Sequence, residues 1–194
     1  MPASAANLMV GPGTLWTGAF GATEPADTAV VTALETPPWT DSGATDGGVT
    51  VTASKEYFRL RMDQAVESPG RVLTELDVSL ATSFAEPTIE NWAIALADAA
   101  SAVTSGGTGG TAYKAMDMGG PAEPGTPPTY LAAIFRGRAP KGKRRMVIVR
   151  KALSIEEVES EYKRDDQTFI PVTMAAHWVS TSIKSVHVVD EATA

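Results

Sequence analysis

The chain has 194 residues, a formal net charge of −7 and a hydrophobic fraction of 43%, which together predict one soluble globular domain rather than a disordered chain. It contains no cysteine, and this excludes a disulfide framework, a thiolate zinc site and a cysteine nucleophile. The first basic residue is Lys55, so we expect no secretory signal. No apolar run reaches the roughly 18 residues of a membrane span. We therefore expect a protein made in the cytoplasm, with no membrane partner.

The first quarter of the chain predicts little regular structure. Residues 1–12 are small and largely uncharged, and they predict a flexible N-terminal arm. A first strand is expected at 14–20. Residues 21–48 are rich in Pro, Thr, Asp and Gly, which favours a long loop with room for one short strand at the apolar residues 29–34.

The segment 71–84 is the clearest strand in the sequence. Apolar and polar residues alternate there with a period of two, as in a strand with one buried face. Strand character is also present at 49–64, and Ser68-Pro69-Gly70 is a turn signal that should join the two strands as a hairpin.

The solvent-exposed face of that hairpin is expected to carry charges of both signs. We expect Arg59 and Arg61 to lie on the same face as Glu75 and Asp77. Opposite charges that face each other across strands contribute roughly 0.2–1 kcal/mol per pair.

One helix is expected, over about 87–104. Apolar residues recur there at three- and four-residue steps from Ile89 to Val103, which is typical of an amphipathic helix. Thr88 is the expected N-cap. The glycine-rich segment 105–110 should end the helix and act as a flexible linker.

The second half of the chain predicts further strands. They are expected at 112–118, 130–138, 144–152, 155–162, 168–179 and 183–189. Helix and strand are close alternatives for 155–162, and the neighbouring hairpins favour a strand. Pro171 cannot donate a ladder hydrogen bond, so we expect an edge or a bulge there. Residues 119–129 hold four prolines and form a connector, and 190–194 form a polar C-terminal tail.

These elements predict a mainly β fold. Because many short strands accompany one helix, we expect a single domain over 1–194, built as an antiparallel β-sandwich or barrel with one flanking helix and long loops.

Basic residues are concentrated in one hairpin. Eight of the sixteen lie between Arg136 and Lys151, a stretch without acidic residues, and the remainder carries eight basic against 23 acidic residues, a formal −15. Such polarity suits head-to-tail contact between copies, and it is also compatible with a nucleic-acid patch. With Phe135 as its only aromatic residue, the hairpin offers little base stacking, which favours a protein interface. The expected interface residues are Arg138, Lys141, Lys143, Arg144 and Arg145, with Glu156, Glu157, Glu159 and Glu161 as the acidic surface of a neighbour.

The sequence offers no catalytic constellation. His177 and His187 are not in a metal-ligand pattern, the segment 105–110 lacks the Lys-Ser/Thr of a phosphate-binding loop, and no G-x-S-x-G occurs. We therefore expect no enzyme activity, with no catalytic, cofactor-binding or metal-binding residues and no cofactor.

Four strings, at 11–16, 86–96, 144–151 and 162–173, occur in an order that resembles the major tail (tail tube) protein of long-tailed bacteriophages with flexible tails, particularly those of actinobacterial hosts. The resemblance spans nearly the whole chain and rests on the order of the strings, because none of them is a chemical motif.

The resemblance implies a structural virion protein. Six copies would form a ring, and stacked rings would form the tail tube, with the tape measure, tail-tip and tail-terminator proteins as further partners. Double-stranded DNA would pass without specific binding, since an acidic lumen repels phosphate; Glu75 and Asp77 are the lumen-facing candidates. Three alternatives stay open: another all-β virion component such as a head-decoration or tail-terminator protein, the tube of a bacterial injection machine, and a nucleic-acid-binding β module.

Overall fold

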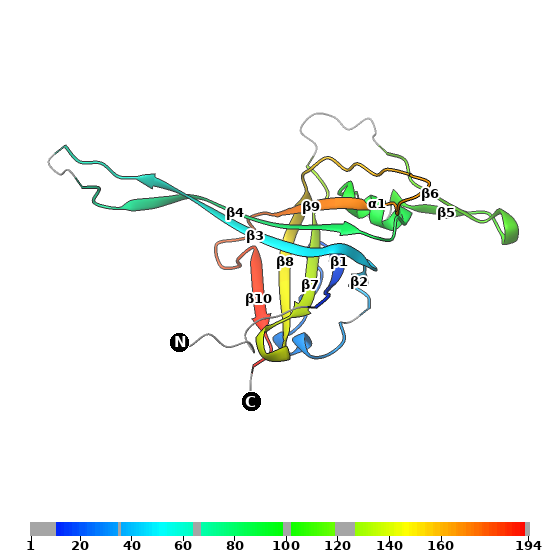
Figure 1. The fold of residues 1–194 in the computed structure, drawn as a ribbon, viewed down its shortest axis with the longest axis horizontal. Helices are drawn as coiled ribbons and strands as arrows, with labels where there is room; N and C mark the ends of the chain where they lie inside the picture. Colours follow the sequence, from blue (N-terminus) through cyan, green and yellow to red (C-terminus); the bar gives the residue numbers. More distant parts are fainter. Residues whose placement is uncertain (1–10, 35, 64–66, 99–101, 119–126, 193–194) are drawn as a thin grey trace.

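The structure is a computed structural model that describes residues 11–34, 36–63, 67–98, 102–118 and 127–192. It is mainly β, and its strands pair in antiparallel fashion (Figure 1). The strands are β1 (Thr14–Ala19), β2 (Thr40–Asp41), β3 (Thr45–Arg59), β4 (Arg71–Phe84), β5 (Thr104–Gly106), β6 (Tyr113–Ala115), β7 (Leu131–Arg138), β8 (Arg144–Ser154), β9 (Ile170–Ala176) and β10 (Val186–Asp190).

Eight strands form one hydrogen-bonded sheet that divides at β8. The order is β2-β1-β7-β8-β9-β4-β3, with β10 also on β8. The first half of β8, Arg145–Val149, pairs with β10, whereas Ala152–Ser154 pairs with β9. Figure 1 shows β3, β4 and β9 crossing β7, β8 and β10 at a steep angle. The strands therefore form two layers with β8 at the corner, which confirms the expected antiparallel sandwich.

The main core lies between these two layers. Leu80, Phe84 and Ile170 come from one layer and Leu15 and Val149 from the other, and each is at most 1% exposed. The alternation of β4 explains its share, because Leu80, Thr82 and Phe84 are buried while Ala81 and Ser83 between them are not.

A second core covers the outer face of β7 and β8. Ile134, Met146 and Ile148 pack there against Val30 and Trp39. This explains why the first half of β7, residues 131–134, and residues 146–149 of β8 are buried on both faces. The strand expected at 29–34 is wrong: the chain instead forms a 3-10 helix at Asp27–Val30 (η2).

The helix is shorter than expected. α1 spans only Ile89–Ala95, capped by Thr88, whose Oγ1 accepts from the backbone N–H of Asn91 at 3.2 Å. It ends where Ala97 adopts a left-handed φ of 57°. The part of the expected range that reaches residue 104 is wrong, because Thr104 begins β5; residues 99–101 lie outside the described part of the chain.

The glycine-rich segment is a tight hairpin turn between β5 and β6, not a linker. Gly107 has a φ of 74°, and a Cβ there would lie 2.1 Å from the carbonyl oxygen of Thr111. Glycine is therefore required at this position, because other residues would meet both backbone strain and a clash.

Two further expectations are corrected and one is confirmed. Residues 155–162 are irregular rather than a strand, although Val158 still packs on the main core. The C-terminal tail expected from 190 begins later, because Asp190 belongs to β10.

The edge expected at Pro171 is confirmed. Pro171 pairs with Ser83 of β4 on one side, and on its other side β8 pairs only with the later residues Met174–Ala176 of β9. The expected N-terminal arm falls mostly on residues 1–10, outside the described range.

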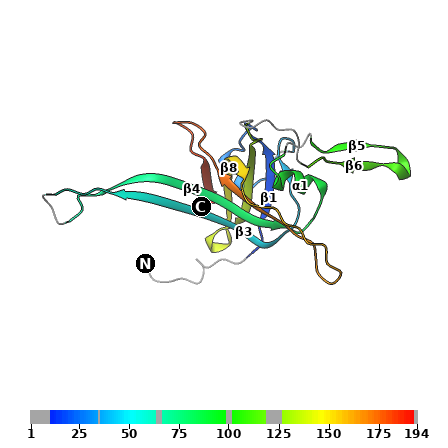
Figure 2. The same ribbon diagram turned by 90° about the horizontal axis from the view of Figure 1, so that it is seen from above.

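The hairpin expected between 49–64 and 71–84 is confirmed, and it extends far beyond the sandwich. The turn expected at Ser68-Pro69-Gly70 is not at its apex, because Gly70 already lies alongside Leu60 and its carbonyl oxygen accepts from the Leu60 N–H. β9 pairs with β4 only from Val78 inward, so residues 54–77, called the long arm here, contain a two-stranded ribbon. Figures 1 and 2 both show this ribbon projecting away from the body.

Candidate assembly surfaces

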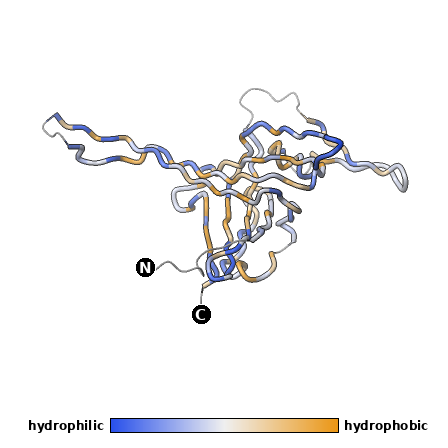
Figure 3. Tube along the Cα trace, in the orientation of Figure 1, coloured by the Kyte–Doolittle hydropathy of each residue, from blue (hydrophilic) through white to orange (hydrophobic). Residues whose placement is uncertain are grey.

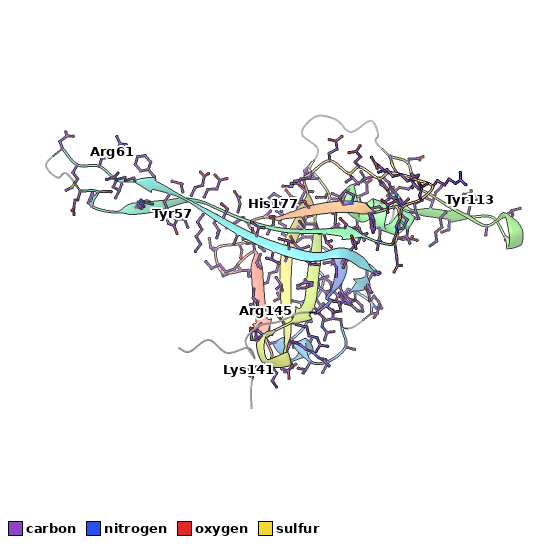
Figure 4. All side chains as sticks on the ribbon, in the orientation of Figure 1. Tyr57, Arg61, Tyr113, Lys141, Arg145 and His177 are labelled. Atoms are coloured by element: carbon purple, nitrogen blue, oxygen red, sulfur yellow. The ribbon has the colours of Figure 1, made fainter. Side chains whose placement is uncertain are left out.

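The long arm exposes large apolar side chains. Tyr57 is 50%, Phe58 62%, Val72 52% and Leu76 50% exposed. Figure 3 shows apolar and polar stretches interleaved along it, and Figure 4 labels Tyr57 part-way along the arm, with Arg61 further out. An isolated two-stranded hairpin is marginally stable in water, and contiguous exposed apolar surface marks an interaction site. The arm therefore has the chemistry of a surface that another molecule covers.

The register of the arm separates its charges by face. A register shift lies between Glu56 and Tyr57, so Tyr57 faces Leu73 while Glu56 faces Glu75. Because of this shift Thr74 has no direct partner on β3, as expected for the extra residue of a β-bulge. Directly opposed residues share a face, and neighbours along a strand alternate between faces.

Two oppositely charged faces result. The basic face carries three basic and no acidic side chains, and the acidic face carries the reverse. The basic face of the arm consists of Lys55, Tyr57 and Arg59 with their partners Leu76, Leu73 and Arg71. The acidic face consists of Ser54, Glu56 and Phe58 with their partners Asp77, Glu75 and Val72.

The expected opposite-charge pairs of the arm are therefore wrong. Arg59 lies opposite Arg71, and it is on the other face from Glu75 and Asp77. Arg61 lies beyond the end of β3. Like charges that face each other across strands are destabilising, and within the described residues none of the arm's charged side chains takes part in an ion pair.

The basic hairpin β7–β8 is in the expected place, but much of its charge is used within the subunit. Lys143 pairs with Glu191 at 3.0 Å. Arg145 forms a two-pronged pair with Asp190, and Arg144 donates to the carbonyl oxygen of Val31 at 2.8 Å. These bonds attach the chain after β10 and the segment near η2 to the hairpin.

Arg138 and Lys141 are the exposed remainder of the hairpin. Lys141 is at its tip, as Figure 4 shows. Arg136, Arg138 and Arg144 line an open cleft of about 250 Å³. Burial, together with the neighbouring Arg144, lowers the pKa of Arg136 from its ordinary value. The cleft is a basic surface suited to a carboxylate from another molecule.

The acidic run lies at the other end of β8. The strand begins at Arg144 in the basic hairpin and ends at Ser154, just before Glu156, Glu157, Glu159 and Glu161. All four glutamates are exposed, and Glu161 pairs with Lys163. The structure thus does not bring the two predicted surfaces together within one subunit, but places them at opposite ends of one strand.

The sequence reasoning missed the apolar part of the arm and the acidic partners of the basic hairpin. The sequence did contain a signal for the apolar part of the arm, because Leu73 is an apolar residue among the alternate positions of its strand that are otherwise polar. The register shift places Leu73 on the same face as Leu76. For the second there was none, because Lys143 and Glu191 are 48 positions apart in the sequence.

The described residues contain no group of three or more His, Asp or Glu side chains that could hold a metal ion. His187 Nε2 lies 3.0 Å from Asp27 Oδ1, and His177 packs edge-on against Tyr130. Within the same ranges no helix combines the length and apolar character needed to cross a membrane.

Over the described residues, the fold and these surfaces define a mainly antiparallel β protein with one short α-helix and a projecting two-stranded arm. No protein-family model matches the chain, and a search of curated proteins finds no significant match.

Proposed function

We propose that this chain is a structural virion subunit that assembles with copies of itself into stacked hexameric rings, forming a phage tail tube through which double-stranded DNA passes. The ring number, the virion location and the tail-tip, tape-measure and terminator partners of this proposal come from the family resemblance. The long arm is the observation that carries self-assembly.

The arm supports assembly because its exposed apolar side chains gain little from the subunit itself. Tyr57, Phe58 and Val72 lie where no third strand pairs with the ribbon. Burying such side chains against another copy would remove apolar surface from water at about 25 cal/mol per Å². A repeated rotation that docks the same surface on each successive copy forms a ring when a whole number of rotations completes the circle.

The two ends of β8 support stacking. A basic cleft and the exposed Lys141 lie at one end, and the acidic run lies at the other. Such an arrangement suits head-to-tail contact between copies along the strand direction, since opposite charges at matching positions select that orientation.

Glu75 and Asp77 remain candidates for a surface that DNA passes. Both are exposed on the acidic face of the arm, and an acidic wall repels phosphate and so lets a duplex slide.

The test removes the arm and leaves the body. Residues 55–76 are replaced by Asn-Gly, because Ser54 and Asp77 are direct partners and a two-residue turn can join them. Since β9 pairs with β4 from Val78 inward, we expect the shortened chain to fold. Negative-stain electron microscopy of the wild type over a concentration and salt series should show rings or tubes, and the shortened chain should stay monomeric.

A wild type that forms discrete trimers, or that binds DNA in a salt-dependent way at physiological ionic strength, would overturn this proposal. A shortened chain that forms tubes as well as the wild type would show that the arm is not the assembling surface.

A further inference from the structure

The two faces of the long arm carry opposite charge, and each face also carries an apolar pair. Tyr57 lies opposite Leu73 on the basic face, and Phe58 lies opposite Val72 on the acidic face. Each face therefore offers an apolar centre beside charges of a single sign. A self-complementary face would instead mix both signs.

We infer that the arms of successive copies stack with the basic face of one against the acidic face of the next. In this arrangement the neighbouring arm covers Glu75 and Asp77, so these two carboxylates belong to the contact between copies and not to a surface that DNA passes. This inference rests on the proposed self-assembly, and it names the surfaces that meet and the geometry they select.

Charge complementarity identifies the partner as a second copy of this arm. Lys55, Arg59 and Arg71 on one face match Glu56, Glu75 and Asp77 on the other in number. The opposed pairs Arg59–Arg71 and Glu56–Glu75 are each unfavourable in a lone arm. A neighbouring arm brings opposite charges close to each pair, so the attractions formed on stacking offset the two repulsions within each arm.

The spacing along the arm is compatible with such contacts. Lys55 and Glu56 are neighbours on β3, and so are Tyr57 and Phe58, so each pair is separated by roughly 3.3 Å of strand. Stacked sheets lie roughly 10 Å apart face to face. Arms stacked with little offset therefore place Lys55 of one copy near Glu56 of the next, and the apolar pairs Tyr57–Leu73 and Phe58–Val72 near each other across the contact. Arg59 is three positions from Glu56, and extended Arg and Glu side chains that lean toward each other along the arm can meet.

The same charges disfavour a two-fold dimer of arms, which is the simplest alternative arrangement. A two-fold dimer packs a face against its own copy, which would set Arg59 and Arg71 against themselves, or Glu56 and Glu75 against themselves. Like-charge contacts of this kind act as a specificity device against the wrong arrangement. The arm therefore favours a head-to-tail series of copies over a closed pair.

The first experiment uses two charge-reversed variants. E56K/E75K makes both faces of the arm basic, and R59E/R71E makes both faces acidic. We expect each alone to lower the sedimenting fraction roughly tenfold. An equimolar mixture should restore it, because the two variants can alternate. Their shared control is D117K/D165K, which changes two exposed carboxylates outside the arm and should assemble as the wild type does.

The second experiment detects the contact directly and needs no complete tube. The chain has no cysteine, so Tyr57→Cys and Phe58→Cys each place a single thiol on one face. After mild oxidation we expect disulfide-linked pairs mainly when the two variants, made distinguishable by a size tag, are mixed. Tyr162→Cys, at a side chain that is 75% exposed, measures random collision.

The outcomes separate this inference from the proposed function. Charge variants that assemble alone, or a mixture that fails to recover, would overturn arm stacking while wild-type tubes uphold self-assembly. Pairs formed mainly by one cysteine variant with itself would indicate a two-fold contact and would also overturn the inference. A wild type without rings or tubes at any concentration, together with cysteine variants that form no cross-linked pairs, would overturn both.

Discussion

Arg145 donates two hydrogen bonds to Asp190, from Nε to Oδ1 at 2.6 Å and from Nη2 to Oδ2 at 2.7 Å. The two residues are direct partners in the β8–β10 register, so this ion pair links the side chains of the last residues that pair in that ladder. β10 pairs with no other strand of the described sheet, which makes this pair part of what holds the C-terminal strand on the body.

The first prediction concerns that pair and its pH dependence. Asp190→Asn should lower the free energy of unfolding by roughly 0.2–1 kcal/mol at neutral pH, because the pair is partly solvated. The bonds from Arg145 hold the pKa of Asp190 below its ordinary 3.8, and Lys143 likewise lowers the pKa of Glu191. A depressed folded-state pKa stabilises the fold above the unfolded-state value, and that stability is lost as pH falls through the folded-state value.

The difference between wild type and Asp190→Asn should therefore be largest at neutral pH and should shrink as the pH falls below about 4. Urea unfolding at several pH values measures it. Asp165→Asn, at an exposed residue, serves as the control. A difference that grew as the pH fell would contradict the assigned direction.

The second prediction contrasts two phenylalanines of one hairpin. Phe84 is fully buried between the two layers, so Phe84→Ala should cost about 3–5 kcal/mol of unfolding free energy. Phe58 is 62% exposed on the arm, so Phe58→Ala should leave monomer stability within about 0.5 kcal/mol but weaken assembly. Denaturant midpoints and sedimentation report the two effects separately; equal loss of stability in both variants would argue against an unpartnered arm.

The third prediction concerns Asn91, a buried polar residue of α1 at 4% exposure. Its Nδ2 donates to the carbonyl oxygens of Ser42 at 3.0 Å and Glu86 at 2.8 Å. Asn91→Ala would leave both acceptors without this donor, at a cost of about 1–3 kcal/mol. Thermal unfolding checks this. Glu90→Ala on the exposed side of the helix is the comparison, and it should cost clearly less.

The fourth prediction separates the two roles of the basic hairpin. Lys143→Glu should lower the melting temperature, because it replaces an ion pair to Glu191 with a repulsion. Lys141 is exposed and belongs to no ion pair among the described residues, so Lys141→Glu should leave the melting temperature unchanged. If the hairpin docks on a neighbour, Lys141→Glu should also make assembly less sensitive to salt. Unchanged assembly and salt response would remove Lys141 from the interface.

The parts of this fold that the sequence predicted are those governed by local pattern. The alternation along β4, the pairing of β3 with β4 as a hairpin and the hairpin β7–β8 all follow from residues close together in the chain. The N-cap at Thr88 was correct for the same reason.

The failures have identifiable physical causes. The far end of the expected helix fails because Thr104–Gly106 finds a strand partner in β6, and tertiary pairing overrides a helical pattern. The strand expected at 155–162 forms no ladder, although Val158 contributes to the core. The charge distribution of the arm depends on one register shift, and period-two reasoning cannot place a bulge.

Strand β8 belongs to both layers, and this sets the order in which the molecule opens. β7 and β10 both pair with Arg145–Val149, and β9 pairs with Ala152–Ser154, where β7 reaches only Ala152. An opening that frees β10 alone, or β9 alone, leaves part of β8 protected. Hydrogen exchange at the buried Val147–Val149 should therefore be among the slowest in the chain and should approach the rate of global unfolding, whereas the amides of the long arm should exchange early in the monomer and become protected only when copies assemble.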